Sequence, residues 1–164
     1  MEEMMCYIPK TLEEALDIKS KHDVIVLAGG SDLMVSNKRT LGLTPKFDKP
    51  VMIVRNLPEL KNIYINDKGE CCIGSGCTSA QIAESTLCPW HLRQAASRMG
   101  AVALRNSATI AGNIANASPK GDTPGPLYML DARVKLSSVF GSREVLVSDF
   151  IVKFRTIDLK PDEM

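Results

Sequence analysis

The stretch VIVLAGGSDLMV (residues 24–35) is an apolar run that two glycines, a serine and an aspartate interrupt. Its first four residues predict a strand, and its last three are apolar again. Gly29 and Gly30 allow two interpretations. Either the chain only needs a tight turn there, or it needs bare backbone amides close to a negatively charged group. The rest of the sequence decides between them.

The bulk composition narrows the class of protein. The chain has 164 residues, enough for one domain or for two small lobes that share an interface. With 45% hydrophobic and 24% charged residues it has the composition of a globular protein. A net charge of +1 without a basic block does not indicate a nucleic-acid partner. There is no signal-peptide core and no apolar run long enough for a membrane span, so we expect a cytoplasmic protein.

The first part of the chain predicts a small α/β lobe over residues 1–55. Thr11 and Glu14 have the spacing of a capping box and begin a helix that ends at His22. The strand at residues 24–27 follows, and a loop rich in Thr, Pro and Lys (residues 36–50) leads to a second strand in VMIVRN (residues 51–56).

Residues 56–164 predict a larger lobe with a mixed sheet and helices packed against it. Its strands are expected in NIYIND (62–67) and GECCIGSG (69–76), and in a hairpin over DARVKLSSVF (131–140) and REVLV (143–147). Its helices are expected at residues 78–84 and from Cys88 to Gly100. The fold class is therefore α+β.

Two patterns of known chemistry are incomplete. IGSGCTSA (73–80) lies between a strand and a helix, as a dinucleotide fingerprint does, but Ser79 replaces its third glycine. No acidic residue follows about twenty positions later to bind a ribose, so a tight turn explains this stretch better.

Neither His22 nor His91 has a partner for a catalytic triad. We expect no catalytic residue in this chain.

The cysteines do not predict a metal site. Cys72 and Cys77 have the spacing that begins one iron–sulfur motif, but Ala80 stands where the third cysteine belongs. All five cysteines are therefore expected to be reduced and to serve as small core residues.

A second unusual stretch is RNSATIAGNIANASPKGDTPGP (residues 105–126). Nearly all residues from 107 to 126 are small, and hydroxyl and amide side chains recur among them. Such a segment adds little to a core but offers neutral hydrogen-bond donors to a close ligand, so we interpret it as an ordered functional loop. Together with the glycine loop it suits a pyrophosphate held by backbone amides rather than lysines. Asp32 should then turn away, toward ribose hydroxyls or to cap the next turn.

Both loops resemble those of the FAD-binding subunits of the molybdenum hydroxylases, the group of xanthine dehydrogenase and carbon monoxide dehydrogenase. The resemblance covers about residues 4–162 and rests on YIPKTLEEALDI (7–18), VLAGGSDLMV (26–35) and LRNSATIAGNIANASPKGDTPGPLYMLDARVKL (104–136). It implies the FAD-binding fold of the vanillyl-alcohol oxidase or PCMH type, with the cofactor between two lobes.

The same resemblance implies the site residues. Both loops would wrap the FAD pyrophosphate, one in each lobe, and Asp122 would reach the ribityl or ribose region. Gly29 and Gly30 would then leave the backbone free to touch phosphate. In the second loop Ala111 stands where the family has the first of two glycines. The expected cofactor-binding residues are Val26, Leu27, Ala28, Gly29, Gly30, Ser31, Asp32, Leu33, Thr109, Ile110, Ala111, Gly112, Asn113 and Asp122.

The function implied is that of an FAD-binding electron-transfer subunit in a molybdopterin-dependent hydroxylase or dehydrogenase. Electrons would pass from the [2Fe–2S] clusters of a small partner subunit through FAD to NAD or another acceptor, and the substrate would react at the molybdopterin of a large subunit. Family subunits continue past the point where this chain ends, so we expect the C-terminal domain to be absent and the chain to be inactive alone. A truncated non-redox module for nucleotide binding or subunit scaffolding, and a stand-alone flavin oxidase, remain as alternatives.

Overall fold

The computed structural model describes residues 5–37 and 46–164, so part of the loop predicted at residues 36–50 lies outside the described residues. Helices and strands alternate at the start of the chain and occur in runs further along it, which agrees with the predicted α+β class. The first lobe holds a small parallel sheet in the order β1-β3-β2. Its elements are β1 (Cys6–Tyr7), α1 (Leu12–Lys21), β2 (Ile25–Leu27), α2 (Leu33–Ser36) and β3 (Val51–Ile53).

The helix and the two strands predicted for this lobe are confirmed. The Thr11 side chain caps α1 by accepting a hydrogen bond from the Glu14 backbone N–H at 3.2 Å. The second half of the capping box differs, because the Glu14 carboxylate accepts from the N–H of Lys10 at 2.7 Å instead of from Thr11. His22 ends the helix as expected.

The apolar residues after the glycines do not resume the strand. They form the helical turn α2, since Gly30 adopts φ +71° and redirects the chain. The N–H of Met34 then donates to the carbonyl of Gly30 at 2.9 Å. Asp32 occupies the cap position of α2, but its side chain makes no capping hydrogen bond.

The second lobe contains three separate antiparallel strand pairs, β4-β5, β6-β7 and β8-β9, instead of the predicted mixed sheet. The two hairpins and the two helices predicted from the sequence are among its elements. These elements are η1 (Pro58–Leu60), β4 (Ile63–Ile65), β5 (Cys71–Ile73), α3 (Ser79–Glu84), α4 (Trp90–Arg98), α5 (Val102–Arg105), α6 (Ile110–Ala115), α7 (Pro124–Met129), β6 (Arg133–Ser138), β7 (Gly141–Leu146), α8 (Val147–Phe150), β8 (Ile151–Lys153) and β9 (Thr156–Ile157).

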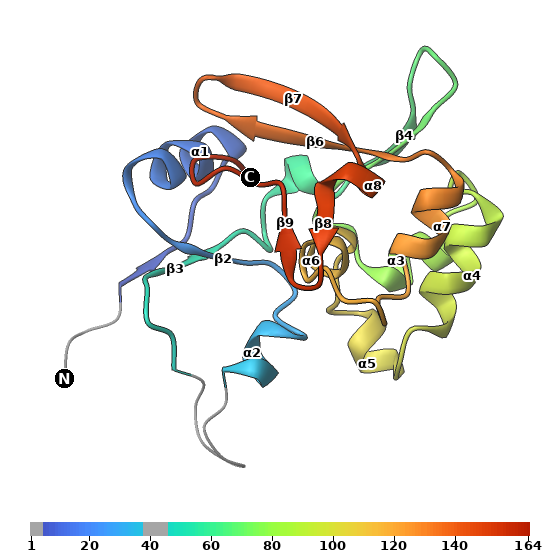
Figure 1. Cartoon of the computed structure of the whole chain (residues 1–164), viewed down its shortest axis with the longest axis horizontal. Coiled ribbons are helices and arrows are strands. Elements are labelled where there is room, and N and C mark those ends of the chain that lie inside the picture. Colours follow the sequence, from blue (N-terminus) through green and yellow to red (C-terminus); the bar gives the residue numbers. More distant parts are fainter. Residues whose placement is uncertain (1–4, 38–45) are drawn as a thin grey trace.

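The segment predicted as a long ordered loop, residues 105–126, is partly helical. It contains α6 and runs into α7. Thr109 caps α6, and Ile110 and Ile114 bury one side of that helix in the core, as their apolar side chains require. In Figure 1, α6 lies near the middle of the molecule, between the first lobe and the helices on the right.

Two apolar clusters form the core. The first contains Ala15, Val24, Met52, Val54 and Leu57. The second gathers side chains from the helices and hairpins that follow, with Cys77, Ile82, Cys88, Leu92, Ala96, Ile110, Ile114, Leu127, Leu136, Val147 and Phe150 at its centre. The chain passes from one cluster to the other just after Leu57, close to the predicted division at residues 55 and 56, which remains a proposal.

The C-terminal segment ties the two clusters together. Met164 pairs with Ser137 of β6 through two backbone hydrogen bonds of 2.9 Å, and its side chain packs against the first cluster. Arg143 of β7 binds the carboxylate of the buried Glu163 with two nitrogens, at 2.7 and 2.9 Å, and donates to Asp158 at 2.6 Å. The chain therefore ends beside α1, under the β6-β7 hairpin (Figure 1).

Cys71, Cys77 and Cys88 lie in or beside the second cluster, whereas Cys6 is exposed and Cys72 is half-buried and not part of that cluster. Burial raises the pKa of the Cys71 thiol to about 12, which keeps it protonated and unreactive at neutral pH. Within residues 5–37 and 46–164 no group of three or more His, Cys, Asp or Glu side chains is arranged to hold a metal ion.

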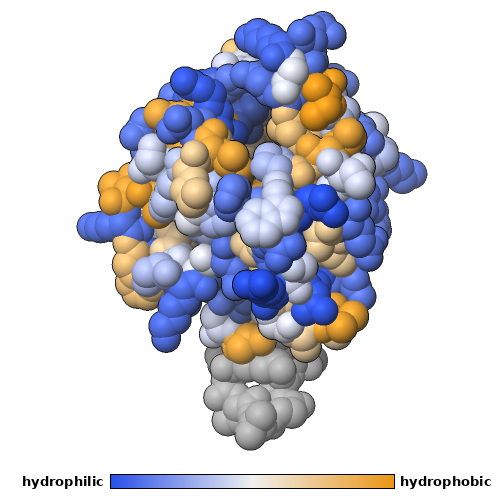
Figure 2. Space-filling view, turned by 90° about the vertical axis from the view of Figure 1, so that its right-hand side faces the viewer, coloured by the Kyte–Doolittle hydropathy of each residue, from blue (hydrophilic) through white to orange (hydrophobic). Residues whose placement is uncertain are grey.

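The face over α4 and α7 carries apolar side chains in separate small groups among hydrophilic ones (Figure 2). Trp90, Tyr128 and Met129 are exposed on these two helices. Scattered apolar side chains are normal on protein surfaces, so this face does not by itself indicate a docking site. Among the described helices, none has the length and apolar character needed to cross a membrane.

Candidate functional site

The candidate site begins where two parallel strands end. β2 and β3 run side by side, and the N–H of Val54 donates to the carbonyl of Leu27 at 3.0 Å just past their ends. The glycine loop (residues 28–33) follows β2, and Arg55 follows β3 at the same edge. Ligands of α/β proteins commonly bind at the carboxyl ends of parallel strands, so this edge is the natural place for a site.

The glycine loop presents unused backbone donors. Among the described residues, none accepts a hydrogen bond from the backbone N–H groups of residues 29–33. Gly30 has a left-handed conformation and Asp32 a right-handed helical one. Successive free N–H groups in a turn can converge on an anion. The first loop therefore offers what a phosphate group needs.

Gly29 has a second role that the sequence did not reveal. A Cβ added at Gly29 would overlap the carbonyl oxygen of Ser107 and lie 2.8 Å from its carbonyl carbon. Only a glycine allows the first loop to approach the backbone before α6 this closely. The structure thus brings the two predicted loops into direct contact.

The second predicted loop differs from the first in its backbone donors. The N–H groups of Ile110, Ala111 and Gly112 already donate to Cys77 O at 3.0 Å, Ser75 O at 3.3 Å and Thr109 Oγ1 at 3.2 Å. The Thr109 hydroxyl oxygen accepts from Gly112, and among the described residues none accepts a hydrogen bond from its hydrogen. A ligand would meet a side-chain hydroxyl at this place rather than a row of bare amides.

Asn113 and Asp122 have different surroundings. The Asn113 amide oxygen accepts from both the N–H and the hydroxyl of Thr123, at 3.1 and 2.7 Å, and so fixes the turn that leads into α7. Asp122, the residue before Thr123, is exposed. The Asn113 contact therefore positions the turn that carries Asp122 next to α6.

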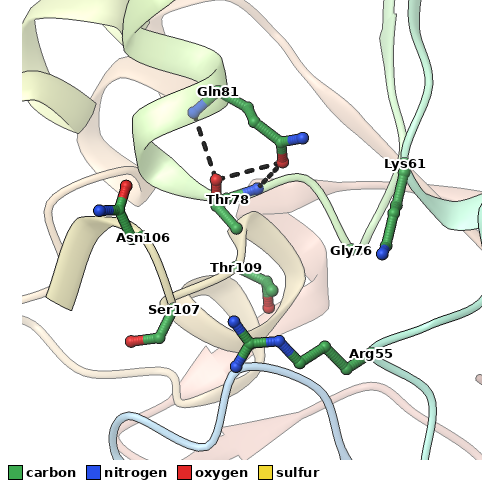
Figure 3. A pocket seen from close by; sticks show the side chains of 8 residues that line it. All are labelled: Arg55, Lys61, Gly76, Thr78, Gln81, Asn106, Ser107 and Thr109. Atoms are coloured by element: carbon green, nitrogen blue, oxygen red, sulfur yellow. Dashed lines mark hydrogen bonds between the residues drawn. The ribbon is translucent and has the colours of Figure 1, made fainter. Parts of the chain in front are cut away.

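A polar cavity of about 230 Å³ opens beside the start of α6, and of the predicted cofactor-binding residues Thr109 alone lines it. It is lined by Arg55, Lys61, Gly76, Thr78, Gln81, Asn106, Ser107 and Thr109. Figure 3 shows Arg55 reaching toward Ser107 and Thr109, with Thr78 and Gln81 joined by the capping hydrogen bonds of α3 on the far side. None of the described residues that line the cavity is acidic, so the cavity favours an anion.

The IGSG stretch is the tight turn that its sequence favours over a dinucleotide fingerprint. A Cβ at Gly74 would overlap the carbonyl of Leu60 and lie 2.9 Å from the N–H nitrogen of Lys61. The N–H of Gly76 donates to the same carbonyl at 2.8 Å. These glycines therefore serve the close packing of two chain segments and hold Lys61 at the edge of the cavity.

The structure brings together the first loop and Thr109, and adds cavity residues that sequence reasoning missed, above all Arg55. A signal for Arg55 was present. It lies near the end of the strand predicted at residues 51–56, and because β3 runs parallel to β2, both segments end at one edge of the sheet. The cavity-lining residues Lys61, Gly76 and Gln81 come from separate segments and carried no such signal.

Comparison with known proteins gives a consistent result. A family model described as the FAD binding domain in molybdopterin dehydrogenase matches residues 2–164. The nicotinate dehydrogenase FAD-subunit of Eubacterium barkeri is 32% identical over 158 residues, covering 92% of this chain and 51% of that subunit. The xanthine dehydrogenase FAD-binding subunit of Escherichia coli O157:H7 is 29% identical over 162 residues, with 94% and 53% covered.

Among solved structures, the reconstituted CO dehydrogenase from Oligotropha carboxidovorans superimposes with a TM-score of 0.87. The sequences are 24% identical, and the match covers 99% of this chain and 57% of that one, which shows a common fold. This chain spans about half the length of the curated relatives it matches.

Proposed function

Since the chain belongs to the family of FAD-binding domains in molybdopterin dehydrogenases, we propose that it is the FAD-binding part of an electron-transfer subunit in such an enzyme. The observation that best supports this role is the first loop, whose five consecutive amides at residues 29–33 have no acceptor among the described residues. When bound, the flavin supplies the redox chemistry, and the protein contributes binding and orientation.

The chain's own residues suit the diphosphate and ribose half of the cofactor. The amides of residues 29–33 would donate to one phosphate, and the Thr109 hydroxyl would donate from the opposite side. Charge-assisted hydrogen bonds of this kind contribute about 1.5–3 kcal/mol each. Val26, Leu27 and Ala28 would form the floor beneath the first loop, with Ser31, Asp32 and Leu33 at its far end.

The other predicted contacts remain part of the proposal, in modified form. Ile110, Ala111 and Gly112 would shape the wall of the site as the first turn of α6. Asn113 would act by holding the turn of Asp122, whose exposed carboxylate would accept hydrogen bonds from ribityl or ribose hydroxyls. The fold would be of the vanillyl-alcohol oxidase or PCMH type, with FAD between the two lobes.

The partners follow from the family. The relatives are subunits of dehydrogenases, and one is named as a medium chain. We therefore propose an iron–sulfur small subunit and a molybdopterin large subunit as partners, with electrons leaving through FAD to NAD or another acceptor, in the cytoplasm. The alternative of a non-redox scaffolding module would not need the free amides of the first loop.

Titration with FAD tests this function. We expect the chain to bind one FAD, with saturable quenching of flavin fluorescence. ADP should compete, because it carries the diphosphate, whereas riboflavin should not compete at the same concentration. Binding of riboflavin as tight as that of FAD, or no binding of FAD at all, would contradict the proposal.

A further inference from the structure

Two positively charged side chains, Arg55 and Lys61, line the polar cavity. The side chains of Arg55 and Lys61 are exposed and form no ion pair or hydrogen bond within residues 5–37 and 46–164. This differs from Arg143, whose guanidinium binds two carboxylates. An arginine that lines a cavity with hydroxyl and amide groups and lacks a carboxylate partner has its donors available to a ligand.

Arg55 stands where the two loops meet. It directly follows Val54, whose N–H binds Leu27 at the start of the first loop, and it lines the cavity with Ser107 and Thr109. In Figure 3 its guanidinium lies between Thr109 and the faint blue ribbon of the first part of the chain. Ser107 is the residue whose carbonyl contacts Gly29, so both loops are next to this guanidinium.

A cation in this place would strengthen the binding of a diphosphate. A dinucleotide diphosphate carries two negative charges, and the first loop adds the carboxylate of Asp32, which makes no capping hydrogen bond to α2. The amides of residues 29–33 and the Thr109 hydroxyl stabilise the phosphates through partial charges, and a nearby cation would add a full positive charge. A guanidinium offers a planar pair of donors that fits two phosphate oxygens at once.

We propose that Arg55 binds the diphosphate of the dinucleotide from the cavity side, opposite the amides of the first loop, and that Lys61 adds positive charge behind it. This inference rests on the proposed function and adds to it a side-chain cation, where the sequence had indicated amides alone. Arg55 is then the residue that sets the preference of the site for dinucleotides over flavins that lack phosphate.

The test compares Arg55→Gln, Arg55→Lys and the control Arg133→Gln, which removes an exposed arginine of β6 outside the cavity. We expect Arg55→Gln to weaken FAD and ADP binding about 10- to 100-fold, the loss of one charge-assisted contact. Arg55→Lys should recover part of this loss because it keeps the charge, and Arg133→Gln should bind like the unmodified chain. The affinity of Arg55→Gln should also fall less steeply with added salt.

The outcomes separate this inference from the function on which it rests. If the unmodified chain binds FAD and Arg55→Gln binds it equally well, Arg55 is not a ligand contact, although the function stands. Equal weakening in Arg55→Gln and Arg55→Lys, with melting temperatures unchanged, would also overturn the proposal, because charge would not matter. If the unmodified chain binds neither FAD nor ADP, the proposed function itself fails.

Discussion

Replacing Gly29 with alanine is expected to lower the melting temperature by about 10 °C and to abolish FAD binding. The added methyl would overlap the carbonyl of Ser107. The carbon and oxygen of this carbonyl belong to the backbone, so they cannot rotate away as a side chain would. Relieving such an overlap costs about 3 kcal/mol, which in a chain of this size corresponds to roughly 10 °C. Thermal unfolding followed by circular dichroism measures the first effect, and FAD titration the second.

The matched control is Gly125→Ala in α7. A Cβ there meets nothing within 4 Å, and alanine favours helix more than glycine does. This variant should melt at the same temperature or slightly higher and should bind FAD normally. If Gly29→Ala behaved like Gly125→Ala, the contact between the two loops would not exist in solution.

The second large effect is expected at Arg143, which holds the C-terminal segment in place. Arg143→Leu would leave the carboxylate of Glu163, whose side chain is only 7% exposed, without its bidentate partner. Among its described partners, the buried carboxylate would keep only the Lys160 N–H at 2.9 Å and the Lys160 ammonium at 3.9 Å, so we expect the melting temperature to fall by roughly 5–10 °C at pH 7. Lys21→Met removes an exposed pair with Asp17 and serves as the control, with an expected change of about 1 °C or less.

The Arg143 contribution should depend on pH with a definite sign. Hydrogen bonds from Arg143 hold the pKa of Glu163 at about 2, below its ordinary value of 4.5. A carboxyl whose pKa is lower in the folded state stabilises the fold above pH 4.5, and this stabilisation disappears as the pH falls from 4.5 toward 2. The difference in melting temperature between the unmodified chain and Arg143→Leu should therefore shrink as the pH falls over this range. A constant difference would contradict the role assigned to the pair of Arg143 and Glu163.

Much of the fold could be predicted because its signals are local. The cap at Thr11, the paired cap of Thr78 and Gln81, and the turn between β4 and β5 each depend on residues within four positions of one another. The hydrophobic pattern also located six strands, β2 to β7, but not β1, β8 and β9. The helical state of residues 110–115 was missed, since small residues and a glycine there lack the amphipathic pattern by which a helix is predicted.

The site was predicted less completely, because its contacts join distant segments. The reason for Gly29 is the carbonyl of Ser107, far along the chain, which no local pattern can reveal. The sequence analysis also predicted free backbone amides in both loops. In the second loop these amides are already used, because they donate to the Thr109 side chain and to the carbonyls of residues 75 and 77. Arg55 was overlooked because its role depends on which strands lie side by side.

The position of the phosphate can be tested directly by ¹H–¹⁵N NMR, in which the backbone amides of the chain are observed before and after addition of FAD. If the first loop holds the diphosphate, the amides of residues 29–33 should shift strongly on addition of FAD or ADP but not of riboflavin. The amides of residues 110–112, which already have protein acceptors, should shift less. Saturable FAD binding that leaves the amides of residues 29–33 unchanged would contradict this assignment.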